Sequence, residues 1–138
     1  MIPLFKVFMA DSAKEAVGSV LSSGFIGQGP KVEEFEVNLK KLLETDYIAT
    51  TNAATSAEHL ALRLMKGFGV EDGDEVLATP LTCTATNWPI LANNLKIKWV
   101  DVDERTLNMD LDDLERKISP STKVIFVVHW GGYPVDLE

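Results

Sequence analysis

A short turn of small residues, Thr51-Asn52-Ala53-Ala54-Thr55-Ser56, is the stretch of this sequence best suited to bind a ligand. It follows a β-branched run at 46–51 and precedes a helical pattern, so we expect a strand, a turn and a helix. The first turn of a helix presents unpaired N–H groups and the positive end of its dipole, which attract phosphate or another anion. The turn is therefore a candidate anion site.

The same residues also allow an interpretation that needs no ligand. Thr55 is the expected N-cap, and Glu58 completes an S/T-x-x-E capping box in which the glutamate reaches back to its own helix end. Without a glycine in the turn, physical reasoning alone favours this capping interpretation. Gly67 and Gly69 end the helix, and its predicted apolar stripe consists of Ala57, Leu60, Ala61, Leu64, Met65 and Phe68.

Strands and helices alternate along the rest of the chain. Strands are predicted at 46–51, 75–79, 96–101 and 123–129, with crossovers long enough for parallel pairing. The sequence therefore predicts an α/β fold, an open and mainly parallel sheet with flanking helices, in a single domain over residues 1–138. Ligands gather beyond the carboxyl ends of such strands, where residues 52–56, 80–84, 101–103 and 129–132 are expected.

The predicted helices carry recognisable start and stop residues. A capping box at Ser12 and Glu15 opens the first, after an extended lead-in over residues 1–10, and Gly24 ends it. A second helix runs from Pro30 to Leu43, with Val32, Phe35, Leu39, Leu42 and Leu43 as its expected buried face. Pro89 requires the helix within 81–94 to start late or to kink, and Asp110 is expected to cap a helix through Ile118.

Two further groups at strand ends could do chemistry. Asp101 and Asp103 could bind a metal or act as acid and base, but no histidine lies nearby in the sequence, so turn capping is favoured. His129 taken alone is best interpreted as a satisfied core or rim histidine, and only the convergence of several segments favours a functional role. We predict no metal site and no catalytic residue in this chain.

Composition excludes several classes of function. The net charge is −8 and the pI is about 4.7, which argues against binding to nucleic acid or to anionic membranes. The single cysteine, Cys83, excludes an internal disulfide and is compatible with a cytoplasmic protein. Pro3 and Lys6 interrupt the apolar start before a secretory signal can form, and no run is long enough to span a membrane.

Several segments, in order, resemble the DegT/DnrJ-type pyridoxal-phosphate-dependent sugar aminotransferases. The segment Thr51–Leu62 is similar to the family's Asn-Ser-Gly-Thr-Ser-Ala-Leu-His-Leu-Ala-Leu, with Ala53 and Ala54 replacing Ser and Gly and Glu58 replacing Leu. The other matches are Ser23–Glu36 with Ser-Gly-x-x-x-x-Gly-Pro-x-Val-x-x-Phe-Glu, Gly73–Val76 with Gly-Asp-Glu-Val, Val100–Asp103 with Val-Asp-Ile-Asp, and Val128–Asp136 with Val-His-x-x-Gly-x-Pro-x-Asp. Pro80–Thr86 resembles the family's Pro-x-x-Thr-x-x-Ala-Thr region but is one residue shorter.

The resemblance implies the large cofactor domain of the aspartate aminotransferase-like fold, of which this chain is an incomplete, amino-terminal part. It implies that Ala54, Thr55 and Ser56 hold the phosphate of pyridoxal 5'-phosphate (PLP). It places Cys83 where many members carry an aromatic ring that stacks on the pyridine, although a small buried thiol is an equal alternative. It implies a homodimer that aminates a nucleotide-linked keto sugar with an amino acid as donor.

In this family the Schiff-base lysine and the aspartate that pairs with the pyridine nitrogen lie beyond residue 138, so we expect the chain alone to be inactive. Leu137 and Glu138 fit either the family or a cloning scar. Three alternatives stay open: a noncatalytic α/β module that binds a phosphorylated small molecule, a truncated product that self-associates through an open sheet edge, and a PLP-dependent sugar dehydratase relative.

Overall fold

A computed structural model of the chain describes residues 6–136. Residues 1–5 of the expected lead-in, and Leu137 and Glu138, lie outside the described part. The chain divides into two compact units, Met1–Thr50 and Thr51–Glu138, and each unit is described by itself.

The first unit contains two helices, α1 (Ala13–Ser23) and α2 (Pro30–Leu42), close to the predicted bounds. Gly24 ends α1 with a φ of 71°, a left-handed conformation that glycine adopts without strain. The predicted capping box of α1 is wrong, because the side chain of the N-cap residue, Ser12, makes no hydrogen bond to the helix. Helix α2 starts at Pro30, and Lys40 and Lys41 complement the dipole in its last turn.

The prediction that α2 buries an apolar face is also wrong. No residue of α1 or α2 is buried, and the exposed fractions of Phe35 and Leu42 are 54% and 76%. Two helices and their connections are too few elements to enclose a core, so the apolar side chains of this unit stay accessible.

The predicted strand at 46–51 does not form. Its backbone is extended toward Thr50 but pairs with no strand of the described chain. Instead, the N–H and hydroxyl of Thr50 both donate to the carboxylate of Glu36, at 2.8 and 2.7 Å, and these bonds lower the pKa of Glu36. A strand needs a neighbouring backbone for its hydrogen bonds, and here a helix side chain takes the place of one.

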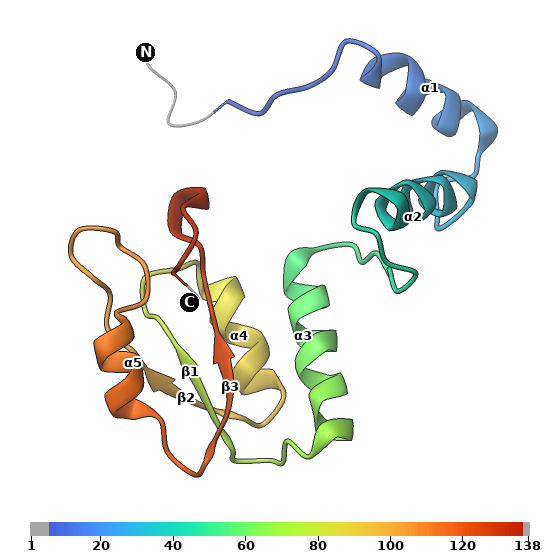
Figure 1. Cartoon of the computed structure of the whole chain (residues 1–138). Helices are drawn as coiled ribbons and strands as arrows, with labels where there is room; N and C mark the ends of the chain where they lie inside the picture. Colours follow the sequence, from blue (N-terminus) through green and yellow to red (C-terminus); the bar gives the residue numbers. More distant parts are fainter. Residues whose placement is uncertain (1–5, 137–138) are drawn as a thin grey trace. The chain divides into compact units, whose positions relative to one another are not determined.

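The second unit contains a parallel sheet of three strands, not the four predicted, in the order β2-β1-β3 (Figure 1). The strands are β1 (Glu75–Ala78), β2 (Lys96–Trp99) and β3 (Thr122–Phe126). The helices are α3 (Ala54–Met65), α4 (Thr84–Ala92) and α5 (Leu111–Lys117), with short 3-10 turns η1 (Lys66–Phe68) and η2 (Trp130–Gly132). Helix α4 begins three residues after Leu81 and contains Pro89.

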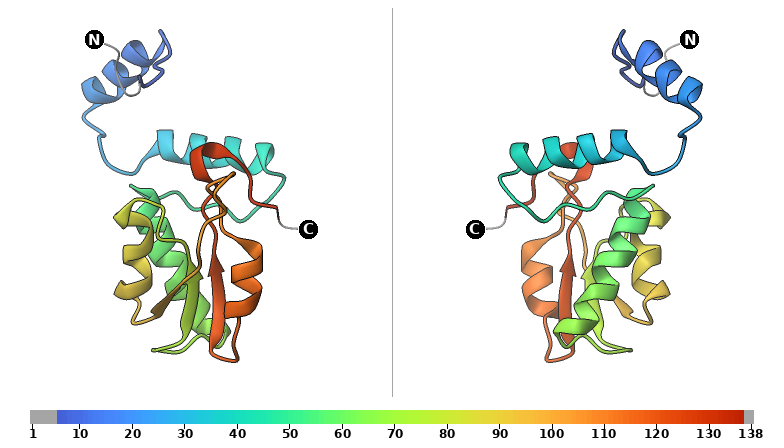
Figure 2. Two further views of the ribbon diagram at one scale, coloured as in Figure 1. Left: turned by 90° about the vertical axis from the view of Figure 1, so that its left-hand side faces the viewer. Right: turned by 90° about the vertical axis from the view of Figure 1, so that its right-hand side faces the viewer.

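The central strand β1 is buried on both faces, as expected for a parallel strand covered by helices. Val76 and Ala78 point into the larger core, beside Leu62 of α3 and Ile90 of α4. Leu77 points the other way, into a smaller cluster that also contains Val100 and Met109. Figure 2 shows α3 and α4 on one side of the sheet and α5 on the other. The alternation along β1 thus fixes which helices cover which face.

Helix α3 uses a different face from the predicted one. Its buried residue is Leu62, whereas Leu60 and Leu64 of the expected stripe are 45% and 59% exposed. Met65 packs against the core from the stripe's edge. The periodic stripe predicted the helix correctly, but the side chains that α3 packs into the core of the described chain are Leu62 and Met65.

Asp110 is the N-cap of α5, and its side chain accepts the N–H of Asp113 at 2.9 Å, as predicted. The carboxylate of Asp113 in turn accepts the N–H of Asp101 at 2.8 Å and the Nζ of Lys117 at 2.6 Å. These bonds lower the pKa of Asp113 to about 2. The carboxylate therefore ties the loop after β2 to α5.

Asp113 makes stability depend on acid in a defined window. Its folded pKa is about 2 and the ordinary value is 3.8, so the unfolded chain binds more protons between these values. Its stabilisation is thus present above about pH 4 and lost as pH falls through about 2. We expect Asp113→Asn to be less stable than wild type at neutral pH and to lose less stability on acidification, in urea unfolding followed by circular dichroism. An NMR titration that gives Asp113 a pKa at or above 3.8 would contradict this.

Candidate functional site

The amino end of α3 differs from the predicted capping box in a way that favours a ligand. The N-cap is Ala53, not Thr55, and no side chain makes a cap bond. Thr55 lies in the first turn, and Glu58 does not reach back to the helix end. Ala53 is extended, with φ −159° and ψ 153°, as an N-cap residue must be. Because alanine has no side-chain acceptor, the start of α3 cannot satisfy itself.

Two amides at this end have no partner in the described chain. The carbonyl of Ala53 accepts the N–H groups of Ser56 and Ala57, at 3.1 and 3.2 Å, and the hydroxyl of Thr51, at 2.8 Å. The N–H groups of Ala54 and Thr55 donate no hydrogen bond within residues 6–136. They lie among exposed, small side chains, so an anion can reach them without moving a bulky group. This geometry fits a phosphate group.

Glu58 is the one feature near this end that opposes an anion. It is half-buried one turn into α3, and burial raises the pKa of its carboxyl. When the pH is below that pKa, the side chain is neutral. When the pH is above it, the side chain places a negative charge in the first turns of the helix. The charge weakens the field that the free amides offer to a phosphate.

Removing this charge should therefore tighten anion binding. We expect Glu58→Gln to raise the affinity for a phosphate monoester about two- to fivefold at neutral pH, the size of a typical charge effect at a helix end. The measurement is calorimetric titration with pyridoxine 5'-phosphate. Glu71→Gln, which removes an exposed carboxylate beyond the other end of α3, is the control and should leave affinity unchanged. Equal affinities of wild type and Glu58→Gln would contradict the expectation.

Cys83 lies at the amino end of α4, as its N-cap residue, and is exposed. The interpretation of Cys83 as a small buried residue is therefore wrong for the described chain. The thiol makes no cap bond to the helix. The segment before it is shaped by hydrogen bonds: the side chain of Asn87 donates to the carbonyl of Thr79 at 3.1 Å, and the hydroxyl of Thr82 donates to that of Thr86 at 3.2 Å.

The structure brings the predicted segments to one edge of the second unit. All three strands are parallel, so the segments that follow them share an edge, and the amino ends of α3 and α4 lie at that same edge (Figures 1 and 2). The segments at 52–56, 80–84, 101–103 and 129–132 were predicted to meet there. Ala54, Thr55, Ser56 and Cys83 thus stand at the start of neighbouring helices on a common rim.

The two other groups at this rim hold loops in place. Asp103 accepts the N–H groups of Arg105 and Thr106, at 2.9 and 2.8 Å, which lower its pKa, and Asp101 accepts the N–H of Val102 at 2.8 Å. The prediction of turn capping is confirmed for Asp103, whereas the side-chain hydrogen bond of Asp101 reaches only the adjacent residue. His129 is exposed, and its Nδ1 accepts the N–H of Val135 at 3.0 Å. Nδ1 is therefore unprotonated in this arrangement.

Sequence reasoning missed two residues that shape the site. Thr51 stood at the edge of the predicted turn with no assigned role, but its hydroxyl donates a hydrogen bond to the carbonyl of the N-cap residue, Ala53, and so orients it. Asn87 lies within the segment predicted to contain a helix and was given no role. Its Oδ1 is buried and has no hydrogen-bond partner among the described residues, which no feature of the sequence indicated.

Two kinds of site were also searched for across residues 6–136. No three acidic, histidine or cysteine side chains cluster in a way that would hold a metal ion. None of the helices in this range combines the length and the apolar character that crossing a membrane requires.

Comparison with known proteins gives a consistent set of relatives. The family model described as "DegT/DnrJ/EryC1/StrS aminotransferase family" matches residues 8–138. The crystal structure of the sugar aminotransferase CalS13 from Micromonospora echinospora is 52% identical, with a TM-score of 0.86, covering 99% of this chain and 37% of that one. The spore coat polysaccharide biosynthesis protein SpsC of Bacillus subtilis (strain 168) is 36% identical over 124 residues, which are 90% of this chain and 31% of SpsC.

A dehydratase is also similar. The E coli GDP-4-keto-6-deoxy-D-mannose-3-dehydratase, solved with bound hydrated PLP, is 28% identical with a TM-score of 0.83, covering 92% of this chain and 33% of that one. The chain spans about a third of the length of each of these relatives.

Proposed function

Because the chain belongs to the DegT/DnrJ/EryC1/StrS aminotransferase family, we propose that it is the amino-terminal part of a PLP-dependent enzyme that aminates a nucleotide-linked keto sugar. The observation that carries the proposal is the pair of free amides, Ala54 and Thr55, at the exposed start of α3. A nucleotide carrier, an amino acid donor and a cytoplasmic location belong to the same proposal. Residues 1–138 would form part of one large cofactor domain.

The residues present fit PLP at its phosphate end. The amides of Ala54 and Thr55 and the hydroxyls of Thr55 and Ser56 would hold the phosphate, with the dipole of α3 behind them. Cys83, exposed at the start of α4, would border the ring with a polarizable but small contact. When bound, PLP supplies the electron sink for the reaction. The residues of this chain bind and orient the cofactor, and the proton transfers belong to residues beyond it.

A homodimer completes the proposal. Helices α1 and α2 bury none of their residues, and they expose Val17, Leu21, Phe35 and Leu42 to 58%, 63%, 54% and 76%. Apolar surface of this extent favours cover by further protein, and a second subunit would supply it.

The test is to compare the 138-residue chain with a longer protein that contains it. The longer protein is incubated with PLP, glutamate and a nucleotide-linked 4-keto sugar, and the sugar product is identified by mass spectrometry. We expect an amino sugar from the longer protein and none from the short chain. A dehydrated sugar would select the dehydratase alternative, which the E coli relative supports. Binding of phosphate esters with no turnover in the longer protein would favour a noncatalytic binding module.

A further inference from the structure

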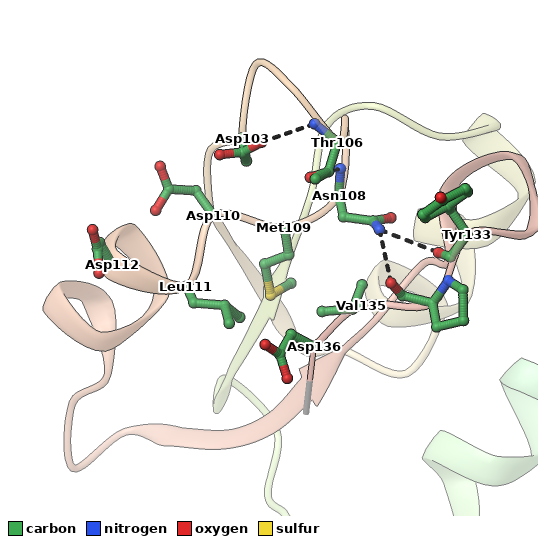
Figure 3. A pocket seen from close by; sticks show the side chains of 11 residues that line it. Asp103, Thr106, Asn108, Met109, Asp110, Leu111, Asp112, Tyr133, Val135 and Asp136 are labelled. Atoms are coloured by element: carbon green, nitrogen blue, oxygen red, sulfur yellow. Dashed lines mark hydrogen bonds between the residues drawn. The ribbon is translucent and has the colours of Figure 1, made fainter. Parts of the chain in front are cut away.

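One buried amide, the side chain of Asn108, connects two loops at the edge of the sheet that carries the candidate site. Asn108 lies in the loop between β2 and α5 and is only 5% exposed. Its Nδ2 donates to the carbonyls of Tyr133 and Pro134, at 3.1 and 3.2 Å, and its Oδ1 accepts the N–H of Trp130 at 2.9 Å. Figure 3 shows the side chain of Asn108 directed at the backbone beside Tyr133.

These three bonds close a turn. Trp130 begins η2 after β3, and Tyr133 and Pro134 follow its end, so a single side chain pins both ends of the segment. Gly131 and Gly132 between them have φ of 60° and 83°, which reverses the chain sharply. A fourth bond, from the N–H of Val135 to Nδ1 of His129, joins the residues just outside these two ends. The turn is therefore held at its base by two side chains.

Only an amide of this length satisfies all three partners. Two carbonyls require two donors and the Trp130 N–H requires an acceptor, which is the set that a carboxamide provides. An aspartate keeps the acceptor but loses both donors, and a leucine loses all three bonds. Asn108 is itself fixed, because its carbonyl accepts the N–H of Asp103 at 2.9 Å and its N–H donates to the hydroxyl of Thr106 at 3.3 Å. The two loops therefore form one rigid piece.

The position of the turn gives it a role. It follows β3, which pairs with β1, so it stands at the edge where ligands of open parallel sheets bind, next to the segment that leads to Cys83. It carries two aromatic side chains, Trp130 and Tyr133, which are 37% and 73% exposed. Rings with an apolar face and a polar tip suit a sugar, whose surface is also part apolar and part hydroxyl.

We propose that Asn108 is a positioning residue, which holds the turn 130–134 in place as a wall of the site for the sugar substrate. The inference rests on the proposed function for the identity of the ligand. A fixed wall contributes by orienting substrate, and a loosened wall mainly weakens substrate binding.

The experiment uses the longer protein that contains this chain, with the variants Asn108→Asp and Asn108→Leu. The first measurement is amide hydrogen exchange, by mass spectrometry on peptides that cover residues 129–135. We expect both variants to exchange faster there at pH 7. In Asn108→Asp, protonation of the new carboxyl restores a donor, so protection relative to Asn108→Leu should return as pH is lowered through the carboxyl's pKa. A fold that is merely loosened would not regain protection in acid.

The second measurement is steady-state kinetics. We expect KM for the sugar in Asn108→Asp to rise about tenfold, with kcat changed by less than about threefold, as lost substrate positioning before the chemical step predicts. Glu115→Gln is the control, because Glu115 is an exposed residue of α5 that makes no bond to the turn within the described residues. Its exchange and KM should equal those of wild type.

Each outcome decides one of the two claims. Unchanged exchange over residues 129–135 in both variants overturns the positioning role, and so does faster exchange with unchanged KM. A wild-type protein that processes no sugar overturns the proposed function instead. The exchange measurement still reports whether Asn108 holds the turn, because it requires no activity.

Discussion

Replacing Ala53 with aspartate is expected to stabilise the protein and, at the same time, to weaken its binding of phosphate esters. Ala53 is the N-cap of α3, already extended, and no side chain caps the helix. An aspartate there accepts the N–H of Thr55 or Ser56, which typically adds about 1 kcal/mol to the free energy of unfolding. The same carboxylate takes up an N–H group that would otherwise bind the phosphate, and it places a negative charge at the phosphate position. We therefore expect the affinity for phosphate esters to fall at least about tenfold.

The two effects have opposite signs, which makes the result diagnostic. Unfolding in urea gives the stability, and calorimetric titration with pyridoxine 5'-phosphate and with pyridoxine gives the part of the affinity that depends on phosphate. Ala53→Ser should stabilise by a similar amount with a smaller loss of affinity, because it caps without charge. Ala57→Asp brings the same charge one turn into α3 without cap geometry and should not stabilise. An Ala53→Asp protein with undiminished phosphate affinity would show that these amides do not bind the ligand.

The alanine at this position also shows where prediction from the sequence stopped. The pattern Thr55-x-x-Glu58 satisfied a known capping rule, yet the helix starts one residue after Ala53, and Thr55 lies inside it. Two overlapping start signals compete in this turn, and the backbone conformation at Ala53 decides between them. Sequence patterns record which residues can cap, whereas the choice depends on how the preceding chain enters the helix.

The strands show the same division between local and non-local information. Val76, Leu77 and Ala78 form a short apolar run bounded by Asp74 and Pro80, and this run predicted a buried strand that the structure contains. Residues 46–51 had comparable β-branched character but found no neighbouring strand in the described chain. Strand formation needs a partner strand, which local sequence does not specify. The alternation of strands and helices therefore predicted the parallel sheet correctly, although the predicted strand at 46–51 is not part of it.

Asn93 was missed for a related reason, and its replacement is expected to have the largest effect on stability. It is 3% exposed, and its Nδ2 donates to the carbonyls of Pro89, at 2.8 Å, and of His59, at 3.2 Å, with Nδ1 of His59 at 3.3 Å. The first bond closes the end of α4 and the second joins α4 to α3. Asn93 therefore fixes the packing of the two helices whose amino ends form the candidate site.

We expect Asn93→Ala to lower the free energy of unfolding by about 2–4 kcal/mol, since two carbonyls lose their donor and a cavity replaces the amide. Asn93→Asp should cost more, because a carboxylate of the same shape faces two carbonyl oxygens while buried. The control is Asn94→Gly. Asn94 is exposed with φ of 59°, a conformation that glycine adopts freely, and the change removes only the exposed bond from Nδ2 to the carboxylate of Asp72, at 3.0 Å, so its effect should stay within about 0.5 kcal/mol. Urea unfolding monitored by tryptophan fluorescence measures all three.

The same variants separate stability from the geometry of the site. If Asn93 sets how α3 lies against α4, the folded fraction of Asn93→Ala should bind inorganic phosphate with wild-type affinity, because the amides of Ala54 and Thr55 belong to α3 alone. Its affinity for pyridoxine 5'-phosphate should fall, since Cys83 at the start of α4 would no longer be held at a fixed distance from that phosphate. Inorganic phosphate is therefore the matched probe. Equal losses for phosphate and for pyridoxine 5'-phosphate would mean that Asn93 supports α3 itself rather than its packing against α4.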